Sequence, residues 1–407
     1  MHLLNTRRLA IVLLPFLVFS GSAFGLTPTK SKKKSKKHAT VAAAPTPTPR
    51  VVKASYVGRP TIVSHLSRLP KKTTVFSPWN VPTFADSTEG DLVDGEDLLV
   101  RRAAVEALGP YNGTVVVADP KTGRILTIVN QKLAFQSGFE PCSTIKIVAA
   151  LAGLNEGILN EQLHFRLTSR RSMDLTDALA HSNNAFFATV GVRLGYDRIV
   201  HYAQLYGLGE KAGLNIQGEQ PGSVASEPPK DGLGMMTSFG EGFYMTPLEL
   251  AALVSAVANG GTLYYLQNPR STEEIEHFTP QVKRELNIAQ YLPSIKPGML
   301  GAVEYGTAKR AGFNATEPIF GKTGTCTDSR SPTHLGWFGS YNETGENKLV
   351  VVVLLTGGKP VSGPVASGVA GNVYKNLSHE NYFAKVKTGA PIALVSTQAC
   401  CALPQQR

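Results

Sequence analysis

Strand-like segments lie at the two ends of the ordered part of this chain, and the stretch between them is mostly helical in pattern. Residues 113–130, GTVVVADPKTGRILTIVN, predict a hairpin because apolar strand patterns flank a Pro-Lys-Thr-Gly turn. Strand patterns return after Pro318, whereas residues 143–258 carry helical patterns such as STIKIVAALAGL. This segregation predicts an α+β fold with one antiparallel β-sheet flanked by helices and a mainly helical subdomain, rather than alternating βαβ units.

The chain begins with the features of an export signal. A short positive stretch, MHLLNTRR, precedes an apolar run of 11 residues, and small residues follow at a cleavage-site spacing. The run is short for a membrane-spanning helix, and Pro15 interrupts it. We expect residues 1–25 to be a signal peptide, with an N-terminal anchor and membrane association through it as the alternative. Either reading predicts an exported protein, in the periplasm or at the outer face of the cytoplasmic membrane.

The basic charge of the chain is concentrated near its start. The sequence holds 41 Lys and Arg against 30 Asp and Glu, a net charge of +11. Residues 1–75 contain 14 of the basic residues and no acidic one, so the remainder is slightly acidic and no nucleic-acid partner is expected. Composition predicts a Lys/Pro/Thr-rich disordered linker over 26–85, a folded domain over 86–385 and a flexible C-terminal tail over 386–407.

Three short motifs follow one another along the folded part. Ser143 and Lys146 form an S-x-x-K at the start of an apolar helix, and Ser182 and Asn184 form an S-x-N in a break between two helices. Lys322 begins a K-T-G on the first strand after Pro318. Each triplet alone is a weak signal, since such short patterns recur by chance. The ordered set, with every member in a fitting structural context, is much more specific.

The ordered set resembles that of penicillin-binding proteins and class A β-lactamases. Two other K-T-G triplets, at Lys121 and Lys387, lack the strand context. The segments DGLGMMTSFGEGFYMTPLELA, YGTAKRAG and GWFGSY are also similar to penicillin-binding transpeptidases, and the resemblance covers about residues 94–385. One departure is Glu241, where that family usually has Gln.

The resemblance implies a penicillin-binding serine D,D-transpeptidase, with residues 86–385 as its transpeptidase domain. Such an enzyme cleaves the D-Ala-D-Ala bond of peptidoglycan stem peptides through an acyl-serine, cross-links them, and also binds β-lactams. Carboxypeptidation stays open, because it shares the same acyl-enzyme. The preceding chain is too short to hold a glycan polymerase, so a separate glycosyltransferase partner is expected. No metal site and no cofactor are predicted.

The four catalytic candidates have roles that follow from their chemistry. A serine hydroxyl needs a base, and Lys146 lies one helical turn from Ser143. In an apolar pocket near the second cation, Lys322, the pKa of the Lys146 amine should fall, so that a neutral amine can take the proton. Ser182 would bridge the two amines and pass a proton to the leaving amine.

The remaining candidates would bind the substrate. Asn184 would hold an amide of the substrate, and the hydroxyls of Thr323 and Thr325 suit a terminal carboxylate. Gly324 of the same triplet belongs to this group. Backbone N–H groups of Ser143 and Thr325 would form the oxyanion hole, the former at a helix N-terminus.

The sequence contains Cys142 beside the candidate nucleophile and Cys326 two residues past the K-T-G glycine. Some carbapenem-hydrolysing class A β-lactamases, which this chain resembles, carry a disulfide at the matching positions. The resemblance therefore implies a Cys142–Cys326 bridge, with two buried thiols as the alternative. We assign no role to Cys400 and Cys401, which lie in the tail.

Two other functions are weighed against the transpeptidase. A class A β-lactamase needs a Glu-activated water to release the acyl group, usually from an E-x-x-L-N that follows the S-x-N. This chain has that pattern at residues 156–160, which is the wrong order. A non-catalytic sensor of β-lactams or wall peptides is the second alternative, and the intact motif set disfavours it.

Overall fold

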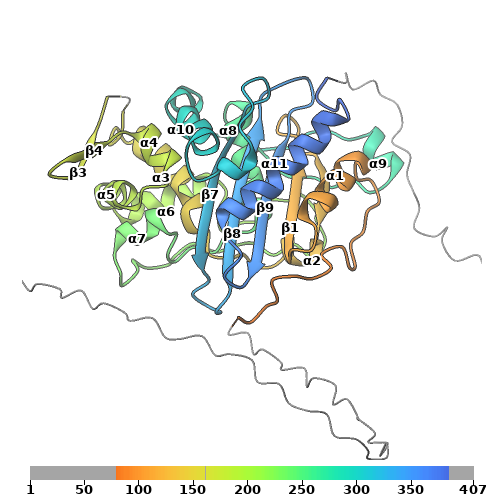
Figure 1. Ribbon diagram of the computed structural model, residues 1–407, viewed down its shortest axis with the longest axis horizontal. Coiled ribbons are helices and arrows are strands. Elements are labelled where there is room, and N and C mark those ends of the chain that lie inside the picture. The colour runs from red at the N-terminus through yellow and green to blue at the C-terminus, as the bar shows by residue number, and fades with distance from the viewer. Residues whose placement is uncertain (1–78, 161, 385–407) are drawn as a thin grey trace, which may run out of the picture. The chain divides into compact units, whose positions relative to one another are not determined.

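The computed structural model describes residues 79–160 and 162–384, and Figure 1 shows their arrangement. The predictions for residues 1–25, for most of the linker and for the tail after residue 385 lie outside these ranges, as do Cys400 and Cys401. Within the described ranges, no helix combines the length and the apolar character that a membrane crossing requires.

One five-stranded sheet joins the two ends of the described chain. Its strand order is β2-β1-β9-β8-β7, and every neighbouring pair is antiparallel. The strands are β1 (Gly113–Ala118), β2 (Ile125–Val129), β7 (Ile319–Thr327), β8 (His334–Asn342) and β9 (Val350–Gly357). The predicted hairpin and the α+β class with one antiparallel sheet are therefore confirmed. The order leaves β7, the strand that carries K-T-G, at one edge of the sheet.

Two small two-stranded antiparallel sheets were not predicted from the sequence. They pair β3 (Phe165–Thr168) with β4 (Arg171–Met173) and β5 (Thr262–Tyr264) with β6 (Val282–Glu285). Strands of three or four residues are too short for an alternating pattern to stand out.

Helices cover both faces of the sheet. They are α1 (Leu98–Leu108), α2 (Gln131–Ala134), α3 (Lys146–Asn155), α4 (Leu175–Ala180), α5 (Asn184–Leu194), α6 (Tyr196–Leu205), α7 (Leu233–Ser238), α8 (Pro247–Asn259), α9 (Thr272–Glu276), α10 (Leu292–Glu304) and α11 (Gly363–His379). Three 3₁₀ turns, η1 (Cys142–Ile145), η2 (Ala289–Tyr291) and η3 (Lys309–Ala311), complete the set.

The buried hydrophobic residues form two clusters, and strand β9 contributes side chains to both. Its residues are all buried, and alternate ones join different clusters because successive side chains point to opposite faces. Val351 and Val353 belong to the cluster that contains α1 and α11, whereas Val352 and Leu354 belong to the cluster that contains α3 and α8. An unbroken apolar run is what a strand covered on both faces requires. The central position of β9 in Figure 1 agrees with this.

Residues 79–85, which composition assigns to the linker, contact the folded domain through backbone hydrogen bonds. The N–H of Asn80 donates to the carbonyl of Pro332, and the N–H of Ala85 donates to that of Pro110, each at 3.1 Å. These backbone hydrogen bonds attach residues 79–85 to the domain, because tertiary contacts can order a segment whose composition favours no structure.

Candidate active site

The nucleophile candidate lies on a tight turn that leads into a buried helix. Ser143 belongs to η1, and α3 begins at Lys146. The apolar residues of α3 are buried on all sides, which explains why the helix is apolar around its whole circumference. The hydroxyl of Ser143 donates to the carbonyl of Ser238 at 3.3 Å, and Cys142 has a positive φ of 49°. For a non-glycine residue such a φ is uncommon, and it marks a backbone held in place by its surroundings.

The amine of Lys146 joins the S-x-x-K to the S-x-N. Its Nζ donates to Ser143 Oγ at 2.7 Å, to Asn184 Oδ1 at 2.6 Å and to Ser182 Oγ at 3.1 Å. The carbonyl of Ser182 is a fourth acceptor, at 3.0 Å. Ser182 has a left-handed φ of 54°, and the side chain of Asn183 caps α5 by accepting from the N–H of Phe186. The break between α4 and α5 thus presents Ser182 and Asn184 to the amine.

Burial lowers the pKa of both lysines. Lys146 is fully buried, and burial followed by the positive charge of Lys322 lowers its pKa to about 6. Lys322 is fully buried too, and burial lowers its pKa to about 7. Across residues 79–160 and 162–384, no carboxylate contributes to either shift or pairs with either amine. A desolvated cation without a counter-ion favours its neutral form.

The structure brings Lys322 to the site but does not make the bridge that the sequence predicts. Lys322 Nζ donates to the carbonyl of Thr323 at 3.0 Å. Within the described residues it has no hydrogen bond to Ser182, whose hydroxyl bonds to Lys146 instead. The reason is local, because the Lys322 amine folds back onto the backbone of its own strand.

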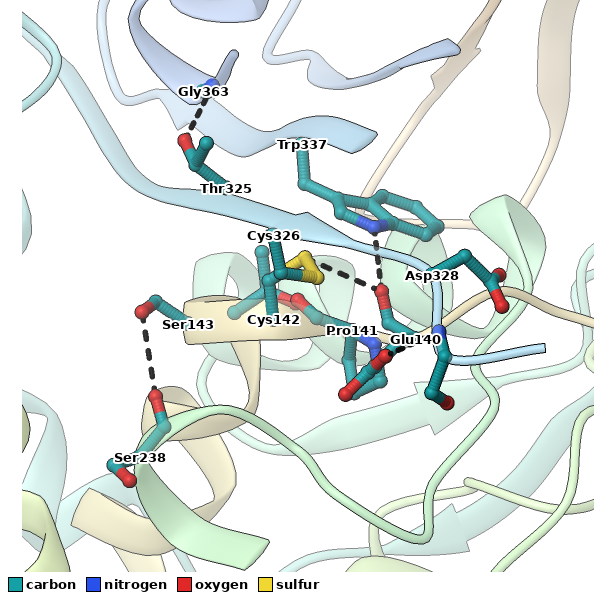
Figure 2. The surroundings of a disulfide bond; sticks show 12 residues. Glu140, Pro141, Cys142, Ser143, Ser238, Thr325, Cys326, Asp328, Trp337 and Gly363 are labelled. Atoms are coloured by element: carbon teal, nitrogen blue, oxygen red, sulfur yellow. Dashed lines mark hydrogen bonds between the residues drawn. A yellow bond between two sulfur atoms is a disulfide. The ribbon is translucent and has the colours of Figure 1, made fainter. Parts of the chain in front are cut away.

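The K-T-G strand approaches the nucleophile closely because its third residue has no side chain. A Cβ on Gly324 would lie 3.0 Å from the carbonyl oxygen of Pro141 and 3.2 Å from Thr144 Cγ2. The indole N–H of Trp337, which pairs with Gly324 across β7 and β8, donates to the carbonyl of Glu140 at 2.9 Å. Figure 2 shows the hydrogen bond between Trp337 and Glu140. Together these contacts fix the segment before Ser143 against the sheet.

Both threonines of the K-T-G strand have hydroxyl partners that the sequence analysis missed. Thr325 Oγ1 accepts from the N–H of Gly363, the first residue of α11, at 2.7 Å. Thr323 Oγ1 lies 2.6 Å from Thr307 Oγ1. Thr307 belongs to the YGTAKRAG segment, whose similarity to penicillin-binding transpeptidases was its only signal. Nothing in the sequence pattern pointed to Gly363.

Cys142 and Cys326 meet beside Ser143. Their sulfur atoms lie 2.00 Å apart and their Cα atoms 5.6 Å apart, in the arrangement of a disulfide that joins η1 to β7 (Figure 2). The placement agrees with the pairing that the resemblance implies.

The glutamate of the E-x-x-L-N pattern lies far from the nucleophile. Glu156 caps the C-terminal end of α3, ten residues and therefore about 15 Å from Lys146 along the helix. Its carboxylate accepts from the hydroxyl of Tyr202 at 2.7 Å and pairs with Arg198 at 3.0 Å. It is therefore a structural group at a helix end, and it cannot activate a water at Ser143.

The segment with the atypical glutamate lies against the nucleophile turn. A Cβ on Gly240 would come within 2.4 Å of the Pro141 ring, and the neighbouring Glu241 has a carboxylate oxygen that is buried and without a hydrogen bond in the described residues. Burial, and then the charge of Asp231, raises the pKa of Glu241. No contact links this carboxylate to Ser143 or Lys146 in the described residues.

Comparisons with known proteins agree with this geometry. A family model described as the penicillin binding protein transpeptidase domain matches residues 113–379. Stage V sporulation protein D of Bacillus subtilis is 27% identical over 319 residues, which are 65% of this chain and 49% of that protein. Peptidoglycan D,D-transpeptidase MrdA of Haemophilus influenzae is 24% identical over 357 residues, 67% of this chain and 54% of that protein. The chain thus spans about half the length of these relatives.

A solved structure shares the fold. The D,D-transpeptidase domain of a peptidoglycan glycosyltransferase from Eggerthella lenta superposes with a TM-score of 0.57 at 21% identity, over 70% of this chain and 82% of that one. The matched family region begins at β1, ends in α11 and contains all three motifs. The chain belongs to the family of the penicillin-binding protein transpeptidase domain.

Proposed function

We propose that the protein is a penicillin-binding serine D,D-transpeptidase that cleaves the D-Ala-D-Ala bond of peptidoglycan stem peptides and cross-links them. One observation carries the proposal: the amine of Lys146 is buried without a carboxylate and lies 2.7 Å from the hydroxyl of Ser143. An amine whose pKa is about 6 is mostly neutral near pH 7, so it can act as a general base.

Acylation would begin with proton transfer. The proton of Ser143 Oγ passes to Lys146 Nζ, and the oxygen attacks the carbonyl carbon of the penultimate D-Ala. Backbone N–H groups of Ser143 and Thr325 would stabilise the oxyanion. As the tetrahedral intermediate collapses, the C–N bond breaks and the terminal D-Ala leaves. Its amine takes the proton held by Lys146 by way of Ser182, whose hydroxyl lies 3.1 Å from that amine.

Cross-linking would reverse these steps with a new amine. The amine of a second stem peptide loses a proton to Lys146 and attacks the acyl-serine, and Ser143 regains its proton as the ester bond breaks. If water takes the place of the amine, the product is the shortened peptide of a carboxypeptidase. The catalytic residues are the same for both acceptors.

The edge strand β7 suits an extended peptide. An edge strand has unpaired backbone groups, so a stem peptide can lie beside β7 as an added strand. The terminal carboxylate would then meet the hydroxyls of Thr323 and Thr325 and the positive charge of Lys322. Asn184, which contacts the Lys146 amine, would hold a substrate amide.

The rest of the assignment follows from the substrate. Peptidoglycan stem peptides are cross-linked outside the cytoplasmic membrane, so the protein would act as an exported enzyme, in the periplasm or at the outer face of that membrane. Its N-terminus would provide any membrane association. A separate glycosyltransferase would supply the glycan strands. The names of the relatives, which include a peptidoglycan D,D-transpeptidase, support this placement.

The test is the intact mass of the full chain during hours of exposure to benzylpenicillin. We expect one penicilloyl adduct, on Ser143, that persists. Ser143→Ala should abolish the adduct, and Ser31→Ala, which alters the other S-x-x-K of the chain, should leave it unchanged. D-Ala release from a stem peptide should depend on Ser143 in the same way.

The other outcomes point to other functions. An adduct that disappears while hydrolysed penicillin accumulates would identify a β-lactamase. A stable adduct without any D-Ala release would identify a sensor. No adduct on the wild-type protein would contradict the proposal.

A further inference from the structure

Thr307 connects two of the three motifs. Its backbone N–H donates to the carbonyl of Ala180, two residues before Ser182, at 3.1 Å. The preceding Gly306 permits this approach, because a Cβ there would lie 2.1 Å from the same carbonyl oxygen. The segment after α10 is therefore wedged between the S-x-N loop and β7, and it presents the Thr307 side chain to Thr323.

The hydrogen bonds of Thr307 decide where the proton of Thr323 points. Thr307 Oγ1 lies 2.6 Å from Thr323 Oγ1 and 3.5 Å from the carbonyl of Ala180. Each hydroxyl has one proton. If Thr307 donates to Ala180, Thr323 must donate to Thr307 and has nothing left for a substrate. If Thr307 donates to Thr323, the proton of Thr323 is free to point into the cleft.

The distances favour the second arrangement, in which Thr307 donates to Thr323. A separation of 2.6 Å is short for two hydroxyls, whereas 3.5 Å is at the limit of a hydrogen bond. The Ala180 carbonyl already accepts the N–H of Thr307, so it loses little when the hydroxyl turns away.

Thr325 has a comparable hydrogen bond, but its donor is a backbone N–H, which cannot reverse the direction of the bond. The backbone N–H of Gly363 donates to Thr325 Oγ1, so the hydroxyl proton of Thr325 remains available for another acceptor. Within the described residues, the Thr323 hydroxyl has no such backbone donor, and Thr307 is its one hydrogen-bond partner. A side-chain hydroxyl thus occupies, beside Thr323, the place that a backbone N–H occupies beside Thr325.

We propose that Thr307 is a positioning residue, which donates its proton to Thr323 Oγ1 so that the Thr323 hydroxyl donates to the terminal carboxylate of the substrate. The inference rests on the proposed function and deepens it. Thr307 itself makes no contact with the substrate, and its effect is confined to substrates that carry the carboxylate.

The experiment compares acylation of the full chain by benzylpenicillin and by its methyl ester, which lacks the carboxylate charge. The measured quantity is the ratio of the two second-order rate constants. Thr307→Val removes the hydroxyl and nearly keeps the shape, and it should lower the ratio about tenfold, as expected for one hydrogen bond to a charged group. Thr307→Ser keeps the hydroxyl and should stay within about twofold of the wild type.

A double-mutant cycle sharpens the test. Thr323→Val should lower the ratio by itself, and adding Thr307→Val to it should cause little further loss, because the two hydroxyls act in series. Thr307→Ala removes the hydroxyl with less bulk and provides the same comparison if the Val variant does not fold.

A ratio that is unchanged in the Val and Ala variants, whether both rate constants stay the same or fall equally, would overturn the role of Thr307. That result would leave the proposed function intact, provided that the wild-type protein and Thr307→Ser are acylated at Ser143. If the wild type is not acylated, the proposed function itself fails.

Discussion

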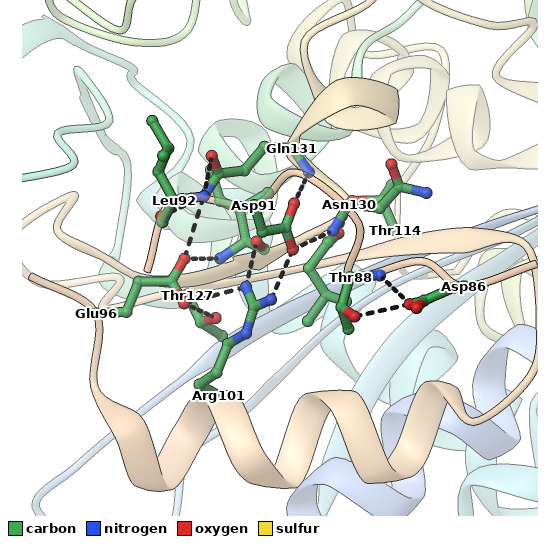
Figure 3. Close-up of polar contacts among 12 residues, drawn as sticks. Asp86, Thr88, Asp91, Leu92, Glu96, Arg101, Thr114, Thr127, Asn130 and Gln131 are labelled. Carbon is green, nitrogen blue, oxygen red and sulfur yellow. Dashed lines mark hydrogen bonds and ion pairs between the residues drawn. The ribbon is translucent and has the colours of Figure 1, made fainter. Parts of the chain in front are cut away.

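Two regions of the molecule bury a basic side chain, and they do so in opposite ways. Arg101 of α1 lies between Asp91 and Glu96, at 2.6 and 3.2 Å, and also donates to the carbonyl of Ile128 at 2.8 Å (Figure 3). Lys146 lies among hydroxyl, amide and carbonyl oxygens, with no carboxylate beside it in the described part of the chain.

The carboxylates of the Arg101 cluster are themselves satisfied. The backbone N–H groups of Asn130 and Gln131 donate to Asp91, and Thr127 and the N–H of Ile128 donate to Glu96. Burial raises the pKa of Glu96, but those hydrogen bonds and the charge of Arg101 oppose the shift. The cluster joins α1 to β2 and to the segment that precedes α1.

The difference shows what a counter-ion does inside a protein. An arginine paired with carboxylates holds structure, whereas a buried lysine without a counter-ion has a lowered pKa and becomes available for chemistry. We therefore expect the buried Lys146 amine to lower the stability of the fold, and the loss of Arg101 from its cluster to be destabilising. Each prediction below breaks or sharpens this contrast.

The largest effect should come from Lys146→Met, which keeps the length of the side chain without the amine. We expect acylation by benzylpenicillin to fall by about 10³-fold or more, because the general base is gone. We also expect the free energy of unfolding at pH 7 to rise by about 2 kcal/mol, since a poorly solvated amine is removed. Stopped-flow acylation and urea unfolding measure the two quantities.

The gain in stability should depend on pH in a defined direction. Lys146 takes up its proton near pH 6 in the folded protein and near its ordinary value of 10.5 when unfolded. Between these values the unfolded chain binds more protons, so wild-type stability rises with pH. The advantage of Lys146→Met should be greatest below pH 6 and vanish above about 10.5. An advantage that does not vary with pH would contradict this account.

Arg101→Met should have the opposite effect on stability. It leaves Asp91 and Glu96 buried without their cation, so we expect a loss of about 3–5 kcal/mol. Acylation of the folded variant should stay within about twofold of the wild type. The neighbouring Arg102, which pairs with Glu380 at the surface, is the matched control, and Arg102→Met should cost less than about 1 kcal/mol.

A further prediction concerns the disulfide expected between Cys142 and Cys326, beside Ser143. Replacing both Cys142 and Cys326 by Ala should lower the free energy of unfolding by about 2–4 kcal/mol, because the bridge closes a loop of 184 residues. The bond is tested first by thiol labelling of unreduced, denatured protein, followed by peptide mapping. Label on both Cys142 and Cys326 would show that no bridge forms.

The smallest predicted change is a shift in the pH dependence of acylation in Lys322→Met, which is separate from the loss of rate expected when the positive charge beside the substrate carboxylate is removed. The positive charge of Lys322 is the second cause, after burial, of the low pKa of Lys146. Its removal should therefore raise the midpoint of the acidic limb, by up to about one pH unit. A midpoint that does not rise would mean that the charge of Lys322 does not act on Lys146.

The sequence predicted those features of the fold and the site whose signal lies within a few neighbouring residues. The hairpin of β1 and β2, the strand that carries Lys322 and the break that presents Ser182 each have a signal within a few residues of sequence. Family resemblance added the pairing of Cys142 with Cys326.

Contacts that depend on tertiary placement had no such signal. Thr307 meets Thr323 only because α10 packs beside β7, and Gly363 meets Thr325 only because α11 begins beside that strand. The orientation of the Lys322 amine toward its own backbone was equally invisible, since a side chain of four methylenes can reach several acceptors.

The most direct test of the account is the pH dependence of wild-type acylation by benzylpenicillin between pH 5 and 9. The second-order rate constant reports the ionisation of the free enzyme. We predict that it rises with pH with a midpoint near 6, where the uncompensated amine of Lys146 loses its proton. A rate that keeps rising through pH 9, toward the ordinary lysine value of 10.5, would contradict the claim that burial without a counter-ion creates the base.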